Sequence, residues 1–403
     1  MKRKHLFYIA LFIVLSSVRF GSCIWYTTQI SNIVNLLIIG LLVGTFLLKP
    51  QYAISEQHFR KEVLLLAVIP FLSSITCYIY RHQSILITIV ASRGTLMWFF
   101  YFFLHRYRFS VNEVEKLLII IGIYTGLLYI VQQITYPSFA WFGVISDEDG
   151  GGEVAMRNGL WRFYIDGVLF LLICCFIYAD RFFKTIKLRN LYVMLFFFIA
   201  IYFTLTRQLI LASMVSFLLV PFLSHQNIKA KWAMIGLIVL GAILIGSVFY
   251  DDLLGRFVEN AQDDINNSDY VRFVAWRYFG LDYWEDGFNM LLGNGKESIG
   301  NSEYGDFIQN LMVQYRLYRS DIGIVGTFSM YGVLYLIVVI AAYIKIFKQL
   351  KYCPTYLYMT IIASLVTIIM ISWVDPVIFG LILYLIDRYK TKTLGRNITT
   401  NIL

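Results

Sequence analysis

Arginines at the ends of apolar runs are the residues of this sequence whose type and spacing could do chemistry. Arg207 opens the apolar run 207–224, directly after Thr206, which can cap the helix that this run predicts. A helix N-terminus with a guanidinium group beside it is an anion site, because both present N–H groups. The preceding helix is only about 25 Å long, so this apex is expected slightly below the outer membrane surface. We favour an anion site over an Arg207 that only reaches lipid head groups.

Further arginines follow in a polar stretch late in the chain. Arg272 follows Asp269 by three residues and precedes Trp276 by four, which is helical spacing, and Arg277 comes one residue later. Two interpretations stay open. One is a surface ion pair worth less than about 1 kcal/mol. The other is an amphipathic helix at the membrane that presents Arg272 and Arg277 to a lipid phosphate.

Arg93 lies inside the apolar run 85–104, near the middle of a bilayer. A charge at that depth is costly and faces a cavity or a partner. Arg93 is therefore either a phosphate ligand or one half of a structural pair with an intramembrane acid such as Asp166. The Gly-Asn-Gly turn at 293–295 is a weaker signal, since its free N–H groups could cradle an anion.

Four acidic residues are candidates for a general base, and Asp321 and Asp269 are favoured among them: Asp269, Glu303, Asp306 and Asp321. Asp321 directly precedes the apolar run 322–344, so helix capping is its competing role. Asp375 precedes Pro376 and is predicted to cap a helix that has Pro at its first position. No His, Cys and carboxylate residues show metal-ligand spacing, and no Walker loop is present, which argues against ATP-driven transport within this chain.

Composition determines the class of protein that carries these residues. Of 403 residues, 59% are hydrophobic and only 15% are charged, against about 25% charged in an ordinary soluble domain. The chain is therefore predicted to be one integral membrane domain, 1–403, and not a soluble globule. The net charge of +9 comes from short basic clusters between apolar runs, which is a topology signal and not a nucleic-acid surface.

Apolar runs of the length needed to cross about 30 Å of hydrocarbon predict an all-α bundle of about twelve spans. The runs are 5–24, 31–48, 62–80, 85–104, 117–136, 164–179, 191–205, 207–224, 232–250, 322–344, 355–372 and 375–387. A smaller external loop is expected at 137–163, and a large one at 251–321, between spans nine and ten.

Lysine and arginine positions orient these spans. If both termini are cytoplasmic, every lysine except Lys296 falls on the cytoplasmic side. The basic residues predicted outside are otherwise arginines, whose planar fork suits phosphate and carboxylate. They are Arg19, Arg81, Arg93, Arg157, Arg162, Arg207, Arg256, Arg272, Arg277, Arg316 and Arg319.

These features together resemble the bacterial O-antigen polymerases of the Wzy type, within the larger group of O-antigen ligases and polymerases. The resemblance covers most of the chain in topology: about twelve spans, cytoplasmic termini and a large periplasmic loop late in the sequence. Locally it rests on three segments in this order: Leu-Thr-Arg-Gln at 205–208, Arg-Phe-Val-Ala-Trp-Arg at 272–277 followed by Leu-Leu-Gly-Asn-Gly at 291–295, and Ser-Asp-Ile-Gly-Ile-Val-Gly at 320–326.

The resemblance implies a glycosyltransferase of the bacterial inner membrane that polymerises polysaccharide repeat units at the periplasmic face without a metal or other cofactor. Its donor would be a glycan on undecaprenyl pyrophosphate, and its acceptor a lipid-linked repeat unit. Preplaced arginines would stabilise the charge on the leaving group. The expected pyrophosphate ligands are Arg93, Arg207, Arg272 and Arg277.

Asp321 or Asp269 would then take the proton of the acceptor hydroxyl. Membrane lipid is an expected partner, and a chain-length regulator is a further candidate. Two alternatives stay open. An O-antigen ligase is disfavoured because ligases of this group carry a histidine in the large loop, and this loop has none. A lipid-linked oligosaccharide flippase is disfavoured because flippases have short loops and two related halves.

Overall fold

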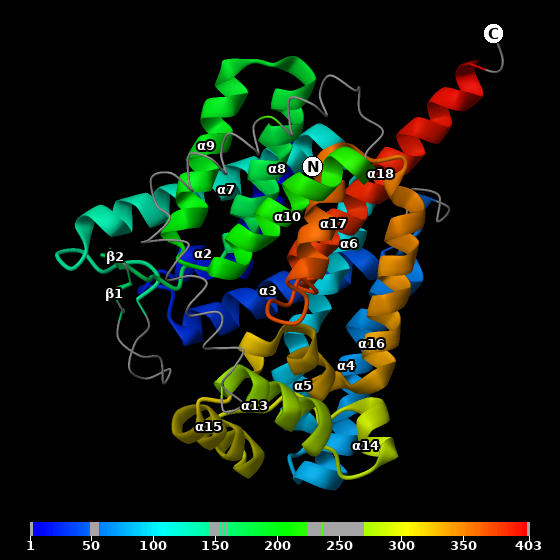
Figure 1. The fold of residues 1–403 in the computed structure, drawn as a ribbon. Coiled ribbons are helices and arrows are strands. Elements are labelled where there is room, and N and C mark those ends of the chain that lie inside the picture. The colour runs from blue at the N-terminus through cyan, green and yellow to red at the C-terminus, as the bar shows by residue number, and fades with distance from the viewer. Residues whose placement is uncertain are drawn as a thin grey trace.

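The chain is built of helices (Figure 1). The computed structural model describes residues 3–48, 56–144, 156–157, 159–223 and 270–400, together with residues 154 and 236. Within these residues the one sheet is an antiparallel pair of short strands, β1 (Met156–Arg157) and β2 (Leu160–Trp161). Apolar runs become helices because a helix satisfies its own backbone hydrogen bonds where water is absent.

The helices follow the chain in two groups. The first group is α1 (Arg3–Ser17), α2 (Arg19–Ser22), α3 (Thr28–Leu47), α4 (Arg60–Arg81), α5 (Ile85–Ser92), η2 (Arg93–Trp98), α6 (Phe99–Arg106), α7 (Val111–Thr135), α8 (Val168–Thr185), α9 (Leu188–Phe203) and α10 (Arg207–Leu223). The second group is α13 (Val271–Arg277), η5 (Tyr278–Asp282), α14 (Gly287–Leu292), α15 (Glu303–Tyr315), η6 (Arg319–Ile322), α16 (Gly323–Leu350), α17 (Thr355–Val366) and α18 (Pro376–Thr400).

Helix length and composition support a membrane protein. Five helical segments of the described residues are long and apolar enough to cross a bilayer: Thr28–Leu47, Arg60–Arg81, Ile85–Arg106, Val111–Thr135 and Arg319–Leu350. Three shorter helices are also apolar: Leu188–Phe203, Arg207–Leu219 and Thr355–Val366. Large apolar side chains on the outward faces are exposed, as on α3, where Leu37 is 70% exposed. Broad exposed apolar surface of this kind suits contact with lipid.

The predicted runs coincide with helices except at particular places. The run 232–250 lies outside the described residues apart from residue 236. The run 5–24 is helical only to Ser17, because the residues after Val18 turn into a left-handed backbone. The run 85–104 passes from α5 into the 3₁₀ helix η2, and α16 is kinked at Gly332, whose φ is 75°. The twelve-span topology itself stays a prediction.

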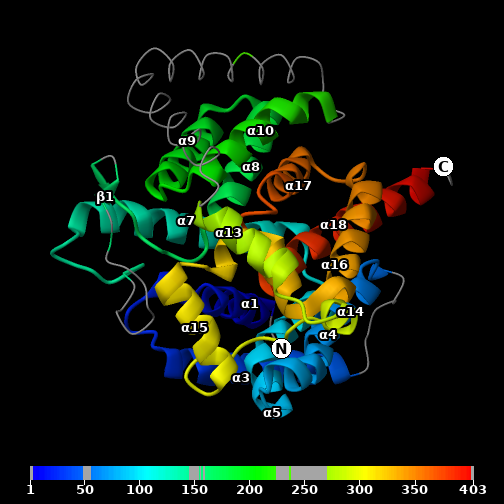
Figure 2. The ribbon, with the colours of Figure 1, turned by 60° about the horizontal axis from the view of Figure 1, so that its bottom comes forward.

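Residues 270–322 fold into short helices, which we call the outer layer. Figure 1 shows α13, α14 and α15 together at one end of the molecule, and Figure 2, which brings that end forward, shows α13 and α15 lying across it. The layer has its own apolar core, which includes Ala275, Phe279, Tyr304 and Ile308 and reaches Cys77 of α4. The first part of the predicted large loop, 251–269, lies outside the described residues.

Buried Arg319 holds the outer layer together. Its Nη1 pairs with Glu297 Oε2 at 2.6 Å, and its Nη2 lies 2.9 Å from the hydroxyls of Tyr283 and Tyr304. Burial raises the pKa of both phenols, so they stay neutral hydrogen-bond partners. Arg81 of α4 donates to the Tyr283 carbonyl oxygen at 2.6 Å. Two of the predicted external arginines are therefore structural.

The turn at 293–295 is also structural, which corrects the prediction that its N–H groups are free to cradle an anion. They donate to the carbonyl oxygens of Asn289, Ser329 and Met330. Gly293 (φ 90°, ψ 175°) packs backbone to backbone against the α16 kink at Gly332. A Cβ on Gly293 would lie 2.3 Å from the Met330 carbonyl oxygen, so only glycine fits this contact.

Candidate functional site

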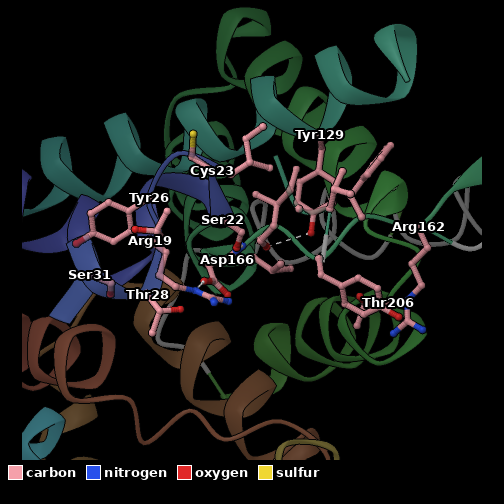
Figure 3. Close-up of a pocket in the computed structure, with 18 of the residues that line it drawn as sticks. Arg19, Ser22, Cys23, Tyr26, Thr28, Ser31, Tyr129, Arg162, Asp166 and Thr206 are labelled. Carbon is pink, nitrogen blue, oxygen red and sulfur yellow. Dashed lines mark hydrogen bonds and ion pairs between the residues drawn. The ribbon is translucent and has the colours of Figure 1, made fainter. Parts of the chain in front are cut away.

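A cavity of about 890 Å³ lies among segments that are far apart in the chain (Figure 3). Its volume falls within the roughly 300–1,000 Å³ of small-molecule sites. Its wall includes Arg19, Arg162, Asp166, Thr206 and Tyr318, and we call it the arginine cavity. The wall also carries several hydroxyl groups and aromatic rings beside its charged side chains, which suits a ligand with both charged and polar parts.

Three helices begin at the arginine cavity. Thr27 and Thr28 at the start of α3, Val168 at the start of α8 and Thr206, which directly precedes α10, all line it. A helix start presents backbone N–H groups and a positive potential equivalent to roughly half an elementary charge. Convergence of three such ends on one cavity favours an anionic ligand such as a phosphate or pyrophosphate.

Charged side chains add to this potential. Arg19 Nε donates to Asp166 Oδ2 at 2.6 Å, and the two side chains remain 54% and 37% exposed. Figure 3 shows Arg19 pointing toward Asp166 inside the cavity. The Arg162 guanidinium lies 4.9 Å from the centre of the Tyr164 ring, a cation–π contact that orients it. A partly solvated pair of this kind can exchange its internal contact for contacts to a ligand.

The backbone that carries Arg19 is strained. Arg19, Phe20, Gly21 and Ser22 have consecutive φ values of 45°, 51°, 76° and 55°. Left-handed backbone costs a non-glycine residue about 1–2 kcal/mol. Two hydrogen bonds hold the turn: Tyr124 Oη donates to the Phe20 carbonyl at 2.8 Å, and the Gly143 N–H donates to the Ser22 carbonyl at 3.0 Å. Strain of this kind clusters at functional sites.

Arg207 is placed next to the cavity. It is the first residue of α10 and is exposed, while its neighbour Thr206 lines the cavity wall. Leu205 has a φ of 51°, which turns the chain sharply between α9 and α10. The Thr206 hydroxyl donates to the Thr204 carbonyl at 3.2 Å. The predicted apex therefore reaches the site, although its anion-binding role stays a prediction.

Arg93 does not pair with Asp166, so that structural alternative is wrong. Its guanidinium donates to the Val90 carbonyl oxygen at 2.7 Å and to Asn32 Oδ1 on α3. Asp166 pairs with Arg19 because α2 and the segment before α8 form the same cavity wall. Arg93 joins η2 to α3, close to the cavity but outside its lining.

The predicted loop arginines lie on α13, away from the cavity wall. Arg277 is 76% exposed and its Nε lies 3.5 Å from Asp282 Oδ2, a surface ion pair of little energetic weight. Arg272 is half-buried. Asp269, one of the two predicted bases, lies outside the described residues. The helix α13 packs against η6, which directly follows the cavity residue Tyr318.

The two predicted capping positions have different outcomes. Asp375 Oδ1 accepts from the N–H groups of Val377 and Ile378, both at 2.9 Å, so the predicted cap is confirmed. Asp321 is exposed within η6, and α16 has Ile322 at its N-cap without a side-chain hydrogen bond, so the capping alternative for Asp321 is wrong. Asp321 lies outside the lining of the arginine cavity.

Sequence reasoning missed that Arg19, Arg162 and Asp166 share one cavity. Arg19 and Asp166 fall inside the predicted runs 5–24 and 164–179, and Arg162 falls just before the second run. Both arginines belong to the arginines predicted on the outer side. That arginine excess was the available signal, but it does not say which members meet. Within the described residues, no group of three or more His, Cys, Asp or Glu lies close enough together to hold a metal.

The fold and the cavity define a helical protein suited to a membrane, with a polar cavity that favours anions. Comparison with known proteins adds no relative, since no family model, no curated protein and no solved structure matches the chain. The function is therefore inferred from the residues and their geometry.

Proposed function

We propose that this chain is a bacterial polysaccharide repeat-unit polymerase of the inner membrane. It would transfer a glycan from undecaprenyl pyrophosphate onto a lipid-linked repeat unit at the periplasmic face. One observation carries the proposal: Arg19, Arg162 and the starts of α3, α8 and α10 converge on one cavity of about 890 Å³. This arrangement suits a pyrophosphate group with part of its attached glycan.

The chemistry follows from these groups. The acceptor hydroxyl attacks the anomeric carbon of the donor, the bond from that carbon to the pyrophosphate oxygen breaks, and undecaprenyl pyrophosphate leaves. Arg19, Arg162 and the helix starts stabilise the negative charge that develops on the leaving group. Asp166, the carboxylate in the cavity wall, accepts the proton of the acceptor hydroxyl and replaces Asp321 as our choice of base.

The other predicted ligands keep secondary roles in the proposal. Arg207 stands one residue from the cavity wall and can approach a bound pyrophosphate from the rim. Arg272 and Arg277 on α13 would contact lipid phosphate near the entrance. Arg93 would have an indirect role next to the arginine cavity, through its hydrogen bond to Asn32.

The position of the chain ends supports the proposed orientation. Arg3 pairs with Glu113, and Tyr389 of α18 donates to Glu115 at 2.7 Å, so the first helix and the middle of the last helix both contact the start of α7. Figure 1 shows the C-terminal end of α18 opposite to the outer layer. This arrangement agrees with two cytoplasmic termini and a periplasmic outer layer.

The test is polymerisation by the purified full-length protein. Undecaprenyl-pyrophosphate repeat units are supplied with EDTA, and products are separated on a gel. We expect a ladder from the wild type, and a rate about 10²–10³ lower in Arg162→Ala, the usual loss when one charge-stabilising donor is removed. Arg207→Ala is expected to lose less. Arg189→Ala, an exposed arginine at the start of α9, is the matched control and should keep the wild-type rate.

Two results would contradict the proposal. One is the absence of a ladder from folded wild-type protein, which would direct attention to ligase and flipping assays. The other is a ladder of normal rate from folded Arg162→Ala, because the arginine cavity could not then hold the leaving group.

A further inference from the structure

A second cavity of about 370 Å³ lies under the outer layer, between η2 and α16. Its wall is rich in hydroxyl groups, including those of Thr95, Thr327, Tyr331 and Ser372. Its volume falls at the lower end of the range for small-molecule sites. We call it the hydroxyl cavity.

One cation and one carboxylate line the hydroxyl cavity without pairing with each other. Lys296 is the lysine that breaks the predicted cytoplasmic pattern, and its ammonium group has no hydrogen-bond or ion-pair partner among the described residues. Asp375 uses Oδ1 to cap α18, and Oδ2 has no such protein partner within the same residues. Because neither charged group has a side-chain partner of opposite charge among the described residues, both are available to a polar ligand in the cavity.

One hydrogen bond joins residues that are next in sequence to the walls of the two cavities. Ser31 of α3 lines the arginine cavity, and the next residue, Asn32, accepts a hydrogen bond from Arg93. The neighbours of Arg93 in the chain, Ser92 and Gly94, line the hydroxyl cavity. The proposed function places the pyrophosphate of a substrate in the first cavity, and part of its glycan would then lie in the second, on the other side of this contact.

We infer that the hydroxyl cavity binds one sugar residue of the glycan substrate. Spaced hydroxyl groups together with one ammonium and one carboxylate offer donors and acceptors on several sides, which matches the hydroxyls of a pyranose. The rings of Tyr331 and Tyr335, whose centroids are 5.2 Å apart, supply apolar surface for a sugar face. The choice of a sugar rests on the proposed function, whereas the cavity and its unsatisfied charges do not.

The test compares a thiol reporter in each cavity of the full-length protein in detergent. Native Cys23 lines the arginine cavity and is half-buried, so it serves as the reporter there. Cys353 is also half-buried and is replaced by serine. The other cysteines are buried and are left in place: Cys77, Cys174 and Cys175. For the hydroxyl cavity the reporter is Thr327→Cys with Cys23 also replaced by serine. The probes are inorganic pyrophosphate and the free oligosaccharide that mild acid releases from the source strain's lipid-linked repeats.

We expect the oligosaccharide to slow maleimide labelling of Thr327→Cys about tenfold when it is present at ten times its Kd. Pyrophosphate should slow labelling of Cys23 and leave Thr327→Cys unaffected. Protection of Thr327→Cys should be lost in Lys296→Met and kept in Lys348→Met, the control at an exposed lysine near the end of α16.

A second variant tests the same cavity in case Lys296→Met does not fold. Gly94 lines the cavity, and a Cβ there meets no heavy atom within 4 Å, so Gly94→Phe is chosen to place a ring in the cavity and is expected to abolish protection. The inference is overturned if the oligosaccharide does not slow labelling of Thr327→Cys, or if protection persists in both Lys296→Met and Gly94→Phe. Failure of the proposed function is recognised separately, by the absence of a ladder from the wild type.

Discussion

Arg19 and Asp166 form an ion pair that solvent and ligand can both reach. The pair is held by a left-handed turn, and Asp166 is further fixed by its N–H, which donates to Ser22 Oγ at 3.1 Å. Its carboxylate is therefore oriented without being buried. That combination suits a base, because the group stays accessible to the acceptor hydroxyl while its position is set.

We predict that Asp166→Asn lowers kcat by about 10²–10⁴, the usual contribution of a general base, with little change in KM. The amide keeps the shape of the side chain but cannot take a proton. The measurement is the initial rate of polymerisation over a range of acceptor concentrations.

Asp282→Asn provides the control for this prediction, since Asp282 is an exposed carboxylate that pairs with Arg277 on the outer layer. It should behave as the wild type. A kcat within threefold of wild type in Asp166→Asn would show that another group takes the proton. A rise in KM equal to the whole loss of kcat/KM would assign Asp166 to binding.

At the scale of elements, the contact between α16 and the turn at 293–295 sets the position of the outer layer. Gly332 interrupts α16 with φ 75° and ψ −175°, a region that only glycine occupies readily. A Cβ there would lie 2.4 Å from the Leu291 carbonyl oxygen. The close contact between the α16 kink and the turn at 293–295 therefore depends on glycine at both positions.

We predict that Gly332→Ala destabilises the attachment of the outer layer by at least about 2 kcal/mol, the strain of a side chain in this backbone region plus a backbone clash. The midpoint of thermal unfolding should fall, and trypsin should cut within 270–322 faster than in the wild type.

The control for this element is Gly287→Ala in the first turn of α14, where a Cβ meets no heavy atom within 4 Å. Its unfolding midpoint should match the wild type. If Gly332→Ala has the same midpoint and the same cleavage rate as Gly287→Ala, then the kink does not hold the layer.

At the scale of the molecule, basic residues and chain ends gather at the end opposite to the outer layer. Arg3, Arg181, Lys345 and Arg388 each pair with a glutamate, and all belong to the set predicted as cytoplasmic. A chain whose two ends lie on one side of a membrane crosses it an even number of times. The twelve spans and the common side of the two ends both stay predictions.

We predict that Ser320→Cys, exposed in the outer layer, reacts with a membrane-impermeant maleimide in spheroplasts. Arg189→Cys, exposed at the start of α9, should react only after permeabilisation, because it is predicted to lie on the cytoplasmic side. Both variants are made with Cys23 and Cys353 replaced by serine. Labelling of both positions in intact spheroplasts, or of Arg189→Cys alone, would contradict the orientation.

The class of the molecule could be read from composition and apolar runs, because helix formation in hydrocarbon depends on local sequence. The cap at Asp375 was predictable for the same reason, since its acceptors lie within three residues. The side of each basic cluster was likewise predicted from loop residues alone, and that orientation stays a prediction.

The site required tertiary packing. Arg19, Asp166 and Thr206 are far apart in sequence, and no spacing rule predicts that they line one cavity. The left-handed turn at 19–22 has one glycine among its four residues, so local propensity favoured continuation of the helix. Hydrogen bonds from Tyr124 and Gly143 stabilise the turn instead. For the turn at 293–295, the sequence predicted N–H groups free to bind an anion. In the folded chain these N–H groups are used in hydrogen bonds, two of them to carbonyl oxygens of α16.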